Sequence, residues 1–238
     1  MGLVGLMGLV GCKQDTFRIS GTLEGGSGQT LWLEELAPDG PMFIDSIRMD
    51  EKGSFEYRYK MPYQSMYTLH KSDNDFIVTL PNYGEQIEVS GNWANLSATY
   101  EVEGSEGSSL LWELQQLTNS GSAVLQQLID TATHYSDLLA AGMVDEATVK
   151  VKKEETDSIF RATFADQREQ VYLFIEAHPG SLASLIALYK SFNNRPLVDP
   201  RTPGAMRYFE MVLEGLQKEA PDNPHTIRYA TSVDRMHR

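Results

Sequence analysis

The chain offers one thiol for chemistry, that of Cys12. A single cysteine forms neither an internal disulfide nor the CxxC pair of a dithiol redox site, and it excludes a cysteine-rich zinc site. The histidines are His70, His134, His178, His225 and His237. No two of them lie four residues apart and HExxH is absent, so their spacing predicts no metal site. We expect His178, which precedes Pro179, to interact with the terminal carbonyls of a helix.

Serine and glycine patterns do not indicate a nucleophile or a phosphate site either. The stretch Gly104-Ser105-Glu106-Gly107 has the wrong spacing for a GxSxG elbow. It predicts a strand-to-helix turn in which Ser105 or Ser108 caps the helix. The glycine-rich residues 25–28 lack both GxGxxG and the P-loop lysine, which favours a hairpin loop over a phosphate cradle. We therefore expect a protein that is not an enzyme and has no catalytic residues and no cofactor.

Carboxylates and tryptophans could bind a ligand, and each has a structural interpretation. The acidic pairs Asp145-Glu146 and Glu154-Glu155 are typical of a solvated helix face. Asp45 lies between apolar residues, so we expect it to hold a loop, with a ligand role as the alternative. The three tryptophans are Trp32, Trp93 and Trp112. They could line a sugar or peptide groove, but packing in the core and between domains is the favoured interpretation.

The first residues resemble a lipoprotein export signal. Residues 1–11 are apolar and uncharged, and their length suits the apolar region of a signal peptide, roughly 7–15 residues, rather than a membrane-spanning helix of about 18. Leu9-Val10-Gly11-Cys12 resembles a bacterial lipobox, in which the cysteine is acylated and becomes the mature N-terminus. The usual opening Lys or Arg is missing, which indicates a start further upstream or a shortened chain. The alternative is a glycine-rich apolar tail with an incidental cysteine.

Composition places the rest of the chain among globular proteins. Apolar residues make up 41% and charged residues 22% of the 238 residues, so a core can form without metal or disulfide. The length allows one large or two small domains. The formal net charge of −13 repels phosphate backbones, and no basic stripe offsets it, so we expect no nucleic-acid partner.

The hydrophobic period changes between residues 99 and 109. Before this stretch, apolar residues recur at every second position, the period of strands. The expected strands cover residues 17–23, 31–33, 47–49, 55–59, 66–70, 76–80, 86–90 and 100–103. Turn-forming residues separate them. Eight short strands at regular spacing predict an antiparallel β-sandwich or barrel over residues 13–104.

After this stretch the period becomes helical, and residues 105–238 form the expected helical region of an α+β protein. Leu110, Leu111, Leu114 and Leu117 begin one apolar stripe, and Gly142 suits the end of that helix. The next helix, expected over residues 144–177, is charged in its first half and apolar along one face of its second. Its start should therefore project into solvent while its end packs. Further helices are expected from Ser181 as N-cap, over 206–216 and over 227–236, with a loop at 193–202.

Several short motifs resemble a known protein family. They are Phe17-x-Ile19-x-Gly21, then Ile44-Asp45-Ser46 with Gly53-x-Phe55, then Tyr100-x-Val102-x-Gly104-Ser105, and finally His178-Pro179-Gly180-Ser181. In this order they are similar to the N-terminal module of unknown function that precedes the thioredoxin-like domain in Gram-negative periplasmic thiol–disulfide oxidoreductase lipoproteins. The resemblance covers roughly residues 13–230 and carries no catalytic residue. The thioredoxin-like domain itself, on the order of 100 residues with a CxxC, is not in this sequence.

The resemblance and the lipobox together imply a non-catalytic accessory or binding module. Residues 1–12 would be the signal segment that ends in the lipidated Cys12, and the rest would face the periplasm or the cell surface from the membrane. A cell-envelope protein is the expected partner. Two alternatives remain open: a fragment of a thiol–disulfide oxidoreductase without its redox domain, and a lipoprotein that binds a solute or glycan.

We predict that Cys12 is lipidated when the protein is expressed with an intact signal. The protein should then partition into detergent, and Cys12→Ala should stay in the aqueous phase or remain unprocessed, because the acyl chains supply the membrane affinity. Intact-mass measurement of the membrane fraction checks this. A mass that retains residues 1–11 and carries no acyl chain contradicts it.

Overall fold

The computed structural model describes residues 15–237, so Cys12 and the expected signal segment lie outside the described residues. The strands of the first half are β1 (Thr16–Glu24), β2 (Thr30–Ala37), β3 (Gly40–Arg48), β4 (Ser54–Lys60), β5 (Tyr67–Ser72), β6 (Asp75–Thr79), β7 (Gln86–Asn92) and β8 (Glu101–Glu103). A 3₁₀ turn, η1 (Trp93–Asn95), and the short helix α1 (Leu96–Thr99) precede β8. The second half contains α2 (Glu106–Ala140), α3 (Glu146–Ala177), α4 (Ala183–Leu188), β9 (Ser191–Phe192), β10 (Arg195–Pro196), α5 (Met206–Glu219) and α6 (Pro224–Met236).

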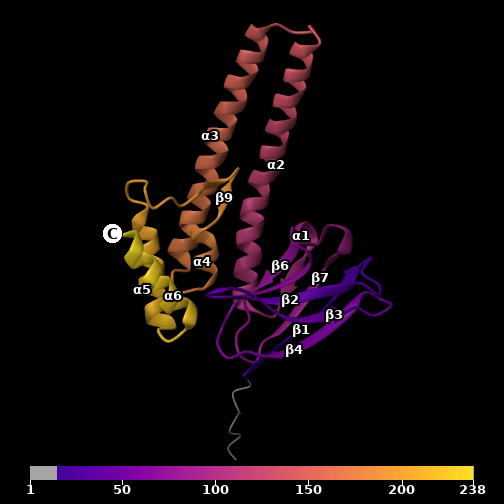
Figure 1. The fold of residues 1–238 in the computed structure, drawn as a ribbon, viewed down its shortest axis with the longest axis vertical. Coiled ribbons are helices and arrows are strands. Elements are labelled where there is room, and N and C mark those ends of the chain that lie inside the picture. The colour runs from indigo at the N-terminus through magenta and orange to yellow at the C-terminus, as the bar shows by residue number, and fades with distance from the viewer. Residues whose placement is uncertain (1–14, 238) are drawn as a thin grey trace, which may run out of the picture.

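The predicted α+β class is confirmed, with strands followed by helices (Figure 1). The strands form two four-stranded sheets, ordered β4-β1-β7-β8 and β3-β2-β5-β6. Alternate residues of both sheets share one buried apolar cluster, which includes Phe17, Ile19, Leu31, Leu33 and Ile87. This is the core of a β-sandwich. Neither sheet closes into a barrel within residues 15–237.

The sandwich is not wholly antiparallel, which corrects the expectation. β1 pairs antiparallel with β4 but parallel with β7. Alternation along a strand shows which face of the strand is buried. It does not show whether the neighbouring strand runs parallel or antiparallel, so the sequence pattern could not predict this pairing. Residues 25–28 also do not close a hairpin, since they lead from β1 in one sheet to β2 in the other.

Two glycines of the motifs quoted above are required by close backbone approach. A Cβ on Gly21 would lie 2.0 Å from the carbonyl oxygen of Val89 on β7. A Cβ on Gly104 would lie 2.0 Å from the carbonyl oxygen of Gln86, and Gly104 has a φ of +81°. Both positions therefore accept only glycine without a shift of β7. The first and third motifs thus fix how β7 sits between β1 and β8.

The first long helix is joined tightly to the sandwich. Ser105 is the N-cap, and its Oγ accepts a hydrogen bond from the Ser108 N–H at 3.2 Å, as the sequence predicted. Ser105 Oγ also donates to the Leu80 carbonyl oxygen at 3.2 Å, and Ser108 Oγ accepts from the Leu80 N–H at 3.0 Å. Gly107 lies against the same residue, where a Cβ would be 2.4 Å from the Leu80 oxygen. The start of α2 is thereby fixed on the residue that follows β6.

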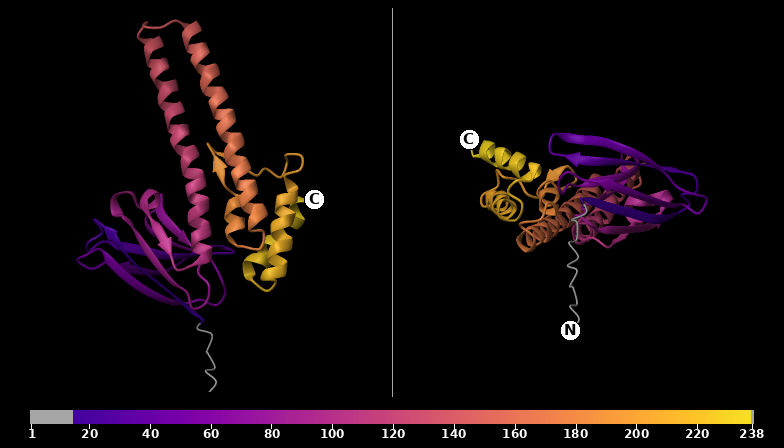
Figure 2. Two further views of the ribbon diagram at one scale, coloured as in Figure 1. Left: turned by 180° about the vertical axis from the view of Figure 1, so that it is seen from behind. Right: turned by 90° about the horizontal axis from the view of Figure 1, so that it is seen from below.

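Helices α2 and α3 form a long antiparallel arm that projects away from the rest of the molecule (Figures 1 and 2). Gly142, with a φ of +68°, ends the first helix as predicted, and the Met143 N–H reaches back to the Leu138 carbonyl. The described buried residues of the arm lie near its base, from Ser108 to Gly121 and from Gln167 to Ile175. The charged first half of α3 therefore projects and its second half packs, as expected. Within residues 15–237, no helix is both long enough and apolar enough to span a bilayer.

The remaining helices pack around the base of the arm and share a core with the sandwich. This second cluster joins Met66 and Leu80 of the sandwich to Leu114 of α2, Ile175 of α3 and Phe209 of α5. Helix α4 is shorter than its apolar pattern suggested. It gives way to the small hairpin β9–β10, whose turn residues Asn193 and Asn194 have φ values of 49° and 58°, the geometry of a type I′ turn.

We predict that Trp112 couples the two halves of the chain during unfolding. Its ring packs against the sandwich cluster and its Nε1–H donates to the Tyr100 carbonyl oxygen at 2.8 Å. Because the ring is only partly buried, Trp112→Ala should cost about 2–3 kcal/mol, below the ~3–5 kcal/mol of a fully buried ring. Urea denaturation followed by circular dichroism should show one shifted transition for strands and helices together.

Trp32→Ala is the matched control, because Trp32 is 40% exposed and surface substitutions change stability by about 0.5 kcal/mol or less. A loss of stability in Trp112→Ala no larger than in this control, or two separate unfolding transitions, would contradict the prediction that Trp112 couples the two halves.

Candidate functional site

Aromatic side chains gather on the outer face of the β3-β2-β5-β6 sheet. The strand register places Trp32 of β2 opposite His70 of β5, and His70 opposite Phe76 of β6. The rings of Trp32 and His70 lie 6.0 Å apart between centroids. In the adjacent row Phe43 of β3 lies opposite Glu34 of β2. We call Trp32, Phe43, His70 and Phe76 the aromatic platform.

The platform is unusual because its large rings are open to solvent. Trp32, Phe43 and Phe76 are 40%, 59% and 38% exposed. Two adjoining hollows, of about 430 and 290 Å³, lie over the platform. Glu34, His70, Ser72 and Asp73 line both of them. Exposed rings over a surface hollow, with a few polar groups beside them, are the features of a ligand site.

Strand pleating explains why these rings face outward. On β2 the buried residues are Leu31 and Leu33, so Trp32 and Glu34 between them point to the other face. A bulge on β3 opposite Leu33 and Glu34 inserts one extra residue, which turns Phe43 onto the same outer face. The platform is thus built by rigid strands and not by loops.

The polar groups of the platform are arranged around one ion pair. Nε2 of His70 lies 3.4 Å from Oε1 of Glu34, and both side chains are largely shielded from solvent. Asp73 adds a second carboxylate to the lining of the hollows. The site is therefore aromatic and rich in hydrogen-bond acceptors.

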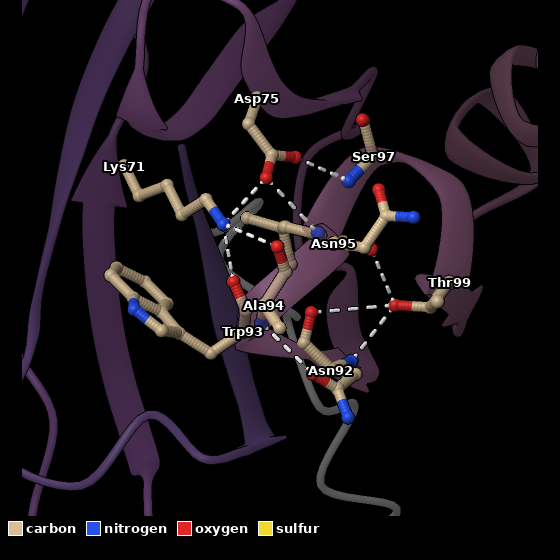
Figure 3. Close-up of polar contacts among 9 residues, drawn as sticks. Lys71, Asp75, Asn92, Trp93, Ala94, Asn95, Ser97 and Thr99 are labelled. Carbon is tan, nitrogen blue, oxygen red and sulfur yellow. Dashed lines mark hydrogen bonds and ion pairs between the residues drawn. The ribbon is translucent and has the colours of Figure 1, made fainter.

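A polar network holds the rim of this site (Figure 3). A second bulge lies between His70 and Ser72, and Lys71 within it also lines the larger of the two hollows. Lys71 Nζ pairs with Asp75 at 2.6 Å and donates to the Trp93 and Ala94 carbonyl oxygens. Since the Lys71 ammonium group is paired with these acceptors, its charge stabilises the fold at this rim.

Asp75 is the centre of that network. Its carboxylate accepts the backbone N–H groups of Ser97 at 2.7 Å and Leu96 at 3.3 Å, in addition to Lys71. Burial works against the charged form, but these hydrogen bonds outweigh it and lower the pKa of Asp75 below its ordinary value. The result ties the β5–β6 hairpin, which forms the platform's edge, to η1 and α1.

The histidines do not come together as a metal site. His70 contacts Glu34, and the ring of His134 meets that of Tyr135 edge to face. His225 is hydrogen bonded to Ser65, and His237 lies near Glu210. His178 ends α3, where its backbone N–H, and not its ring, donates to the Phe174 carbonyl, while the ring lies 5.1 Å from that of Phe174. No cluster of three or more metal-binding side chains occurs among the described residues.

The other predicted candidates take structural places. Asp45 lies within β3 and bonds to the neighbouring strand and not to the loop that we expected it to hold: its Oδ2 accepts the Tyr57 hydroxyl of β4 at 2.9 Å. Burial and this hydrogen bond raise the pKa of Tyr57 to about 12. Trp93 and Trp112 pack against the sandwich cluster. Trp32 alone of the three tryptophans is on the platform, so they do not share one groove.

Sequence reasoning missed Phe43, Phe76 and Glu34 as site residues. The alternating pattern placed the third strand only from residue 47, so Phe43 was not assigned to a face of the sheet. Phe76 was counted with its strand but not given a face, although the buried Ile77 next to it puts Phe76 outside. The alternation of buried and exposed residues along each strand was the signal that could have placed Phe43 and Phe76 on the outer face.

Comparison of the chain with protein-family models, curated proteins and solved structures found no match. Function is therefore argued from the geometry and chemistry of the site.

We predict that Asp75→Asn destabilises the protein by about 2–3 kcal/mol at neutral pH, because a buried ion pair and two charge-assisted hydrogen bonds are weakened. Because the pKa of Asp75 is lowered in the folded protein, the contribution of its charge to stability falls as the pH falls. The charged form stabilises the fold above the ordinary carboxyl pKa of about 3.9, and this contribution is lost as pH falls through the lowered value.

Urea unfolding of both proteins between pH 3 and pH 7 measures this difference. It should shrink toward zero at the acid end. A difference that stays constant with pH would show that the charge of Asp75 is not what holds the rim.

Proposed function

We propose that this protein is a non-catalytic binding module of the bacterial cell envelope. In this proposal a lipid on Cys12 holds it at the membrane, the folded part faces the periplasm, and the aromatic platform takes a neutral saccharide. The single observation that carries the proposal is the set of solvent-exposed rings on Trp32, Phe43 and Phe76, which neighbouring strands of one sheet face present together.

The chemistry of the lining favours a saccharide. The faces of sugar rings carry C–H groups that pack on aromatic rings, and their edges carry hydroxyls. Glu34 and Asp73 supply acceptors for those hydroxyls beside the rings. The two carboxylates and the net charge of −13 disfavour polyanionic glycans. A neutral oligosaccharide of pyranose rings is therefore the ligand class we propose.

The support for an accessory role is the resemblance of the chain's motifs to the front module of periplasmic redox lipoproteins. Gly21 and Gly104 in those motifs hold the sandwich together and make no contact with the platform. A shared scaffold with a separate ligand face is consistent with a binding module.

Isothermal titration with maltohexaose and cellohexaose tests the proposal. At least one should bind, and Trp32→Ala should lower that affinity by at least about tenfold, which corresponds to the ~1.4 kcal/mol expected for loss of one stacking ring. Tyr189→Ala is the matched control, since Tyr189 is an exposed aromatic residue, 62% accessible, on the helical half. Absence of binding to either sugar at millimolar concentration, or equal losses in the two variants, would contradict the proposal.

A further inference from the structure

A second carboxylate, Glu35, is buried at one end of the sandwich. Leu31 and Leu33 point into the core of the sandwich, and Glu35 continues their parity on β2. Its side chain therefore faces inward and the residue is 1% exposed. A carboxylate in the interior is costly unless hydrogen bonds or an opposite charge compensate it.

Compensation is weak among the described residues. Neither Oε1 nor Oε2 of Glu35 completes a hydrogen bond of normal geometry, and the buried hydroxyl of Tyr67 is also without a partner. Burial, together with an interaction between the Tyr63 hydroxyl and the Glu35 carboxylate, raises the pKa of Tyr63 to about 12. Burial and the charge of Glu35 also raise the pKa of Tyr59 and Tyr67.

The only ionisable base beside Glu35 in the described part of the chain does not neutralise it. His225 of α6 is 6% exposed, and its Nε2 is 2.8 Å from Ser65 Oγ. Burial lowers the pKa of His225 even against the attraction of Glu35, which favours the neutral ring. Arg228 lies further along α6 and is paired with Asp39 at 3.8 Å on the surface.

A hollow of about 440 Å³ adjoins this cluster. Its wall consists of Tyr63, Ala37 at the end of β2 with Pro38 and Asp39 after it, and Pro224, Ile227, Arg228 and Thr231 of α6. Asn223, the N-cap of α6, donates to the Gln64 carbonyl oxygen at 2.8 Å and so holds the helix over this end of the sandwich. Tyr63 is the residue common to the hollow and to the surroundings of Glu35.

We propose that Glu35 anchors a binding site for a primary alkylammonium group, which enters from the hollow beside Tyr63. An alkylammonium carries three N–H donors and one positive charge. Glu35 Oε1, Glu35 Oε2 and the Tyr67 hydroxyl oxygen are three buried acceptors without partners among the described residues. The occupant we infer is a free aliphatic amine, because Tyr63, Pro224 and Ile227 in the wall of the hollow offer apolar contact to its alkyl chain.

Thermal shift and isothermal titration of the whole chain at pH 7.5 test this site with n-butylamine and putrescine. Both should bind, and Glu35→Gln should weaken that binding by at least tenfold. Glu88→Gln, which removes an exposed carboxylate on β7 of the other sheet, is the matched control and should leave amine binding unchanged. Tetramethylammonium has the same charge but no N–H donor, so it should bind at least tenfold more weakly than n-butylamine.

Tyr67→Phe provides a second variant that leaves the charge in place and should weaken amine binding severalfold by removing one acceptor. Nα-acetyl-lysine methylamide distinguishes a peptide lysine from a free amine and should bind more weakly than n-butylamine. The proposal is overturned if neither amine binds at 10 mM, if Glu35→Gln binds them as well as the unaltered protein, or if tetramethylammonium binds as tightly as n-butylamine. These probes contain no sugar ring, so the result is independent of the saccharide proposal.

Discussion

The clamp between Leu80 and the start of α2 is the contact on which the arrangement of the molecule depends. Ser105 and Ser108 satisfy both backbone groups of Leu80, and Gly107 allows the helix to approach it. Since Leu80 follows β6 directly, the clamp sets the direction in which α2 leaves the sandwich (Figure 1). The arm then stands over a shared core that contains Met66 and Leu80 together with α3 and α5. One joint therefore positions the helical half against the sheet that bears the platform.

Much of the fold could be predicted because periodicity reports burial directly. The change of period near residues 99–109, the cap at Ser105 and the helix end at Gly142 are local signals, and the structure confirms them. The parallel pairing of β1 with β7 is a long-range choice, made by residues about 70 positions apart. The only local trace of this parallel pairing is Gly21, which the close approach of β7 requires to be glycine. The domain boundary at residue 104 and the lipidation of Cys12 stay predictions.

The site was less predictable because it depends on which face of each strand a residue occupies. Glu34 and Glu35 are neighbours in sequence, yet the pleat sends Glu34 to the aromatic platform and Glu35 into the sandwich. A bulge on β3 changes the parity of Phe43, and a bulge leaves no clear mark in a single sequence. Trp32 was recognised as a candidate from its type alone, whereas its partners required the register.

The central claim is that the aromatic platform takes a sugar ring, and the indole N–H signals of ¹⁵N-labelled protein test it most directly. The chain has three tryptophans: Trp32 lies on the platform, while Trp93 and Trp112 pack against the sandwich core. On titration with the hexasaccharides, the account predicts a saturable shift of the Trp32 indole resonance while the other two stay in place. Movement of Trp93 or Trp112 without Trp32, or no movement at all, would contradict it.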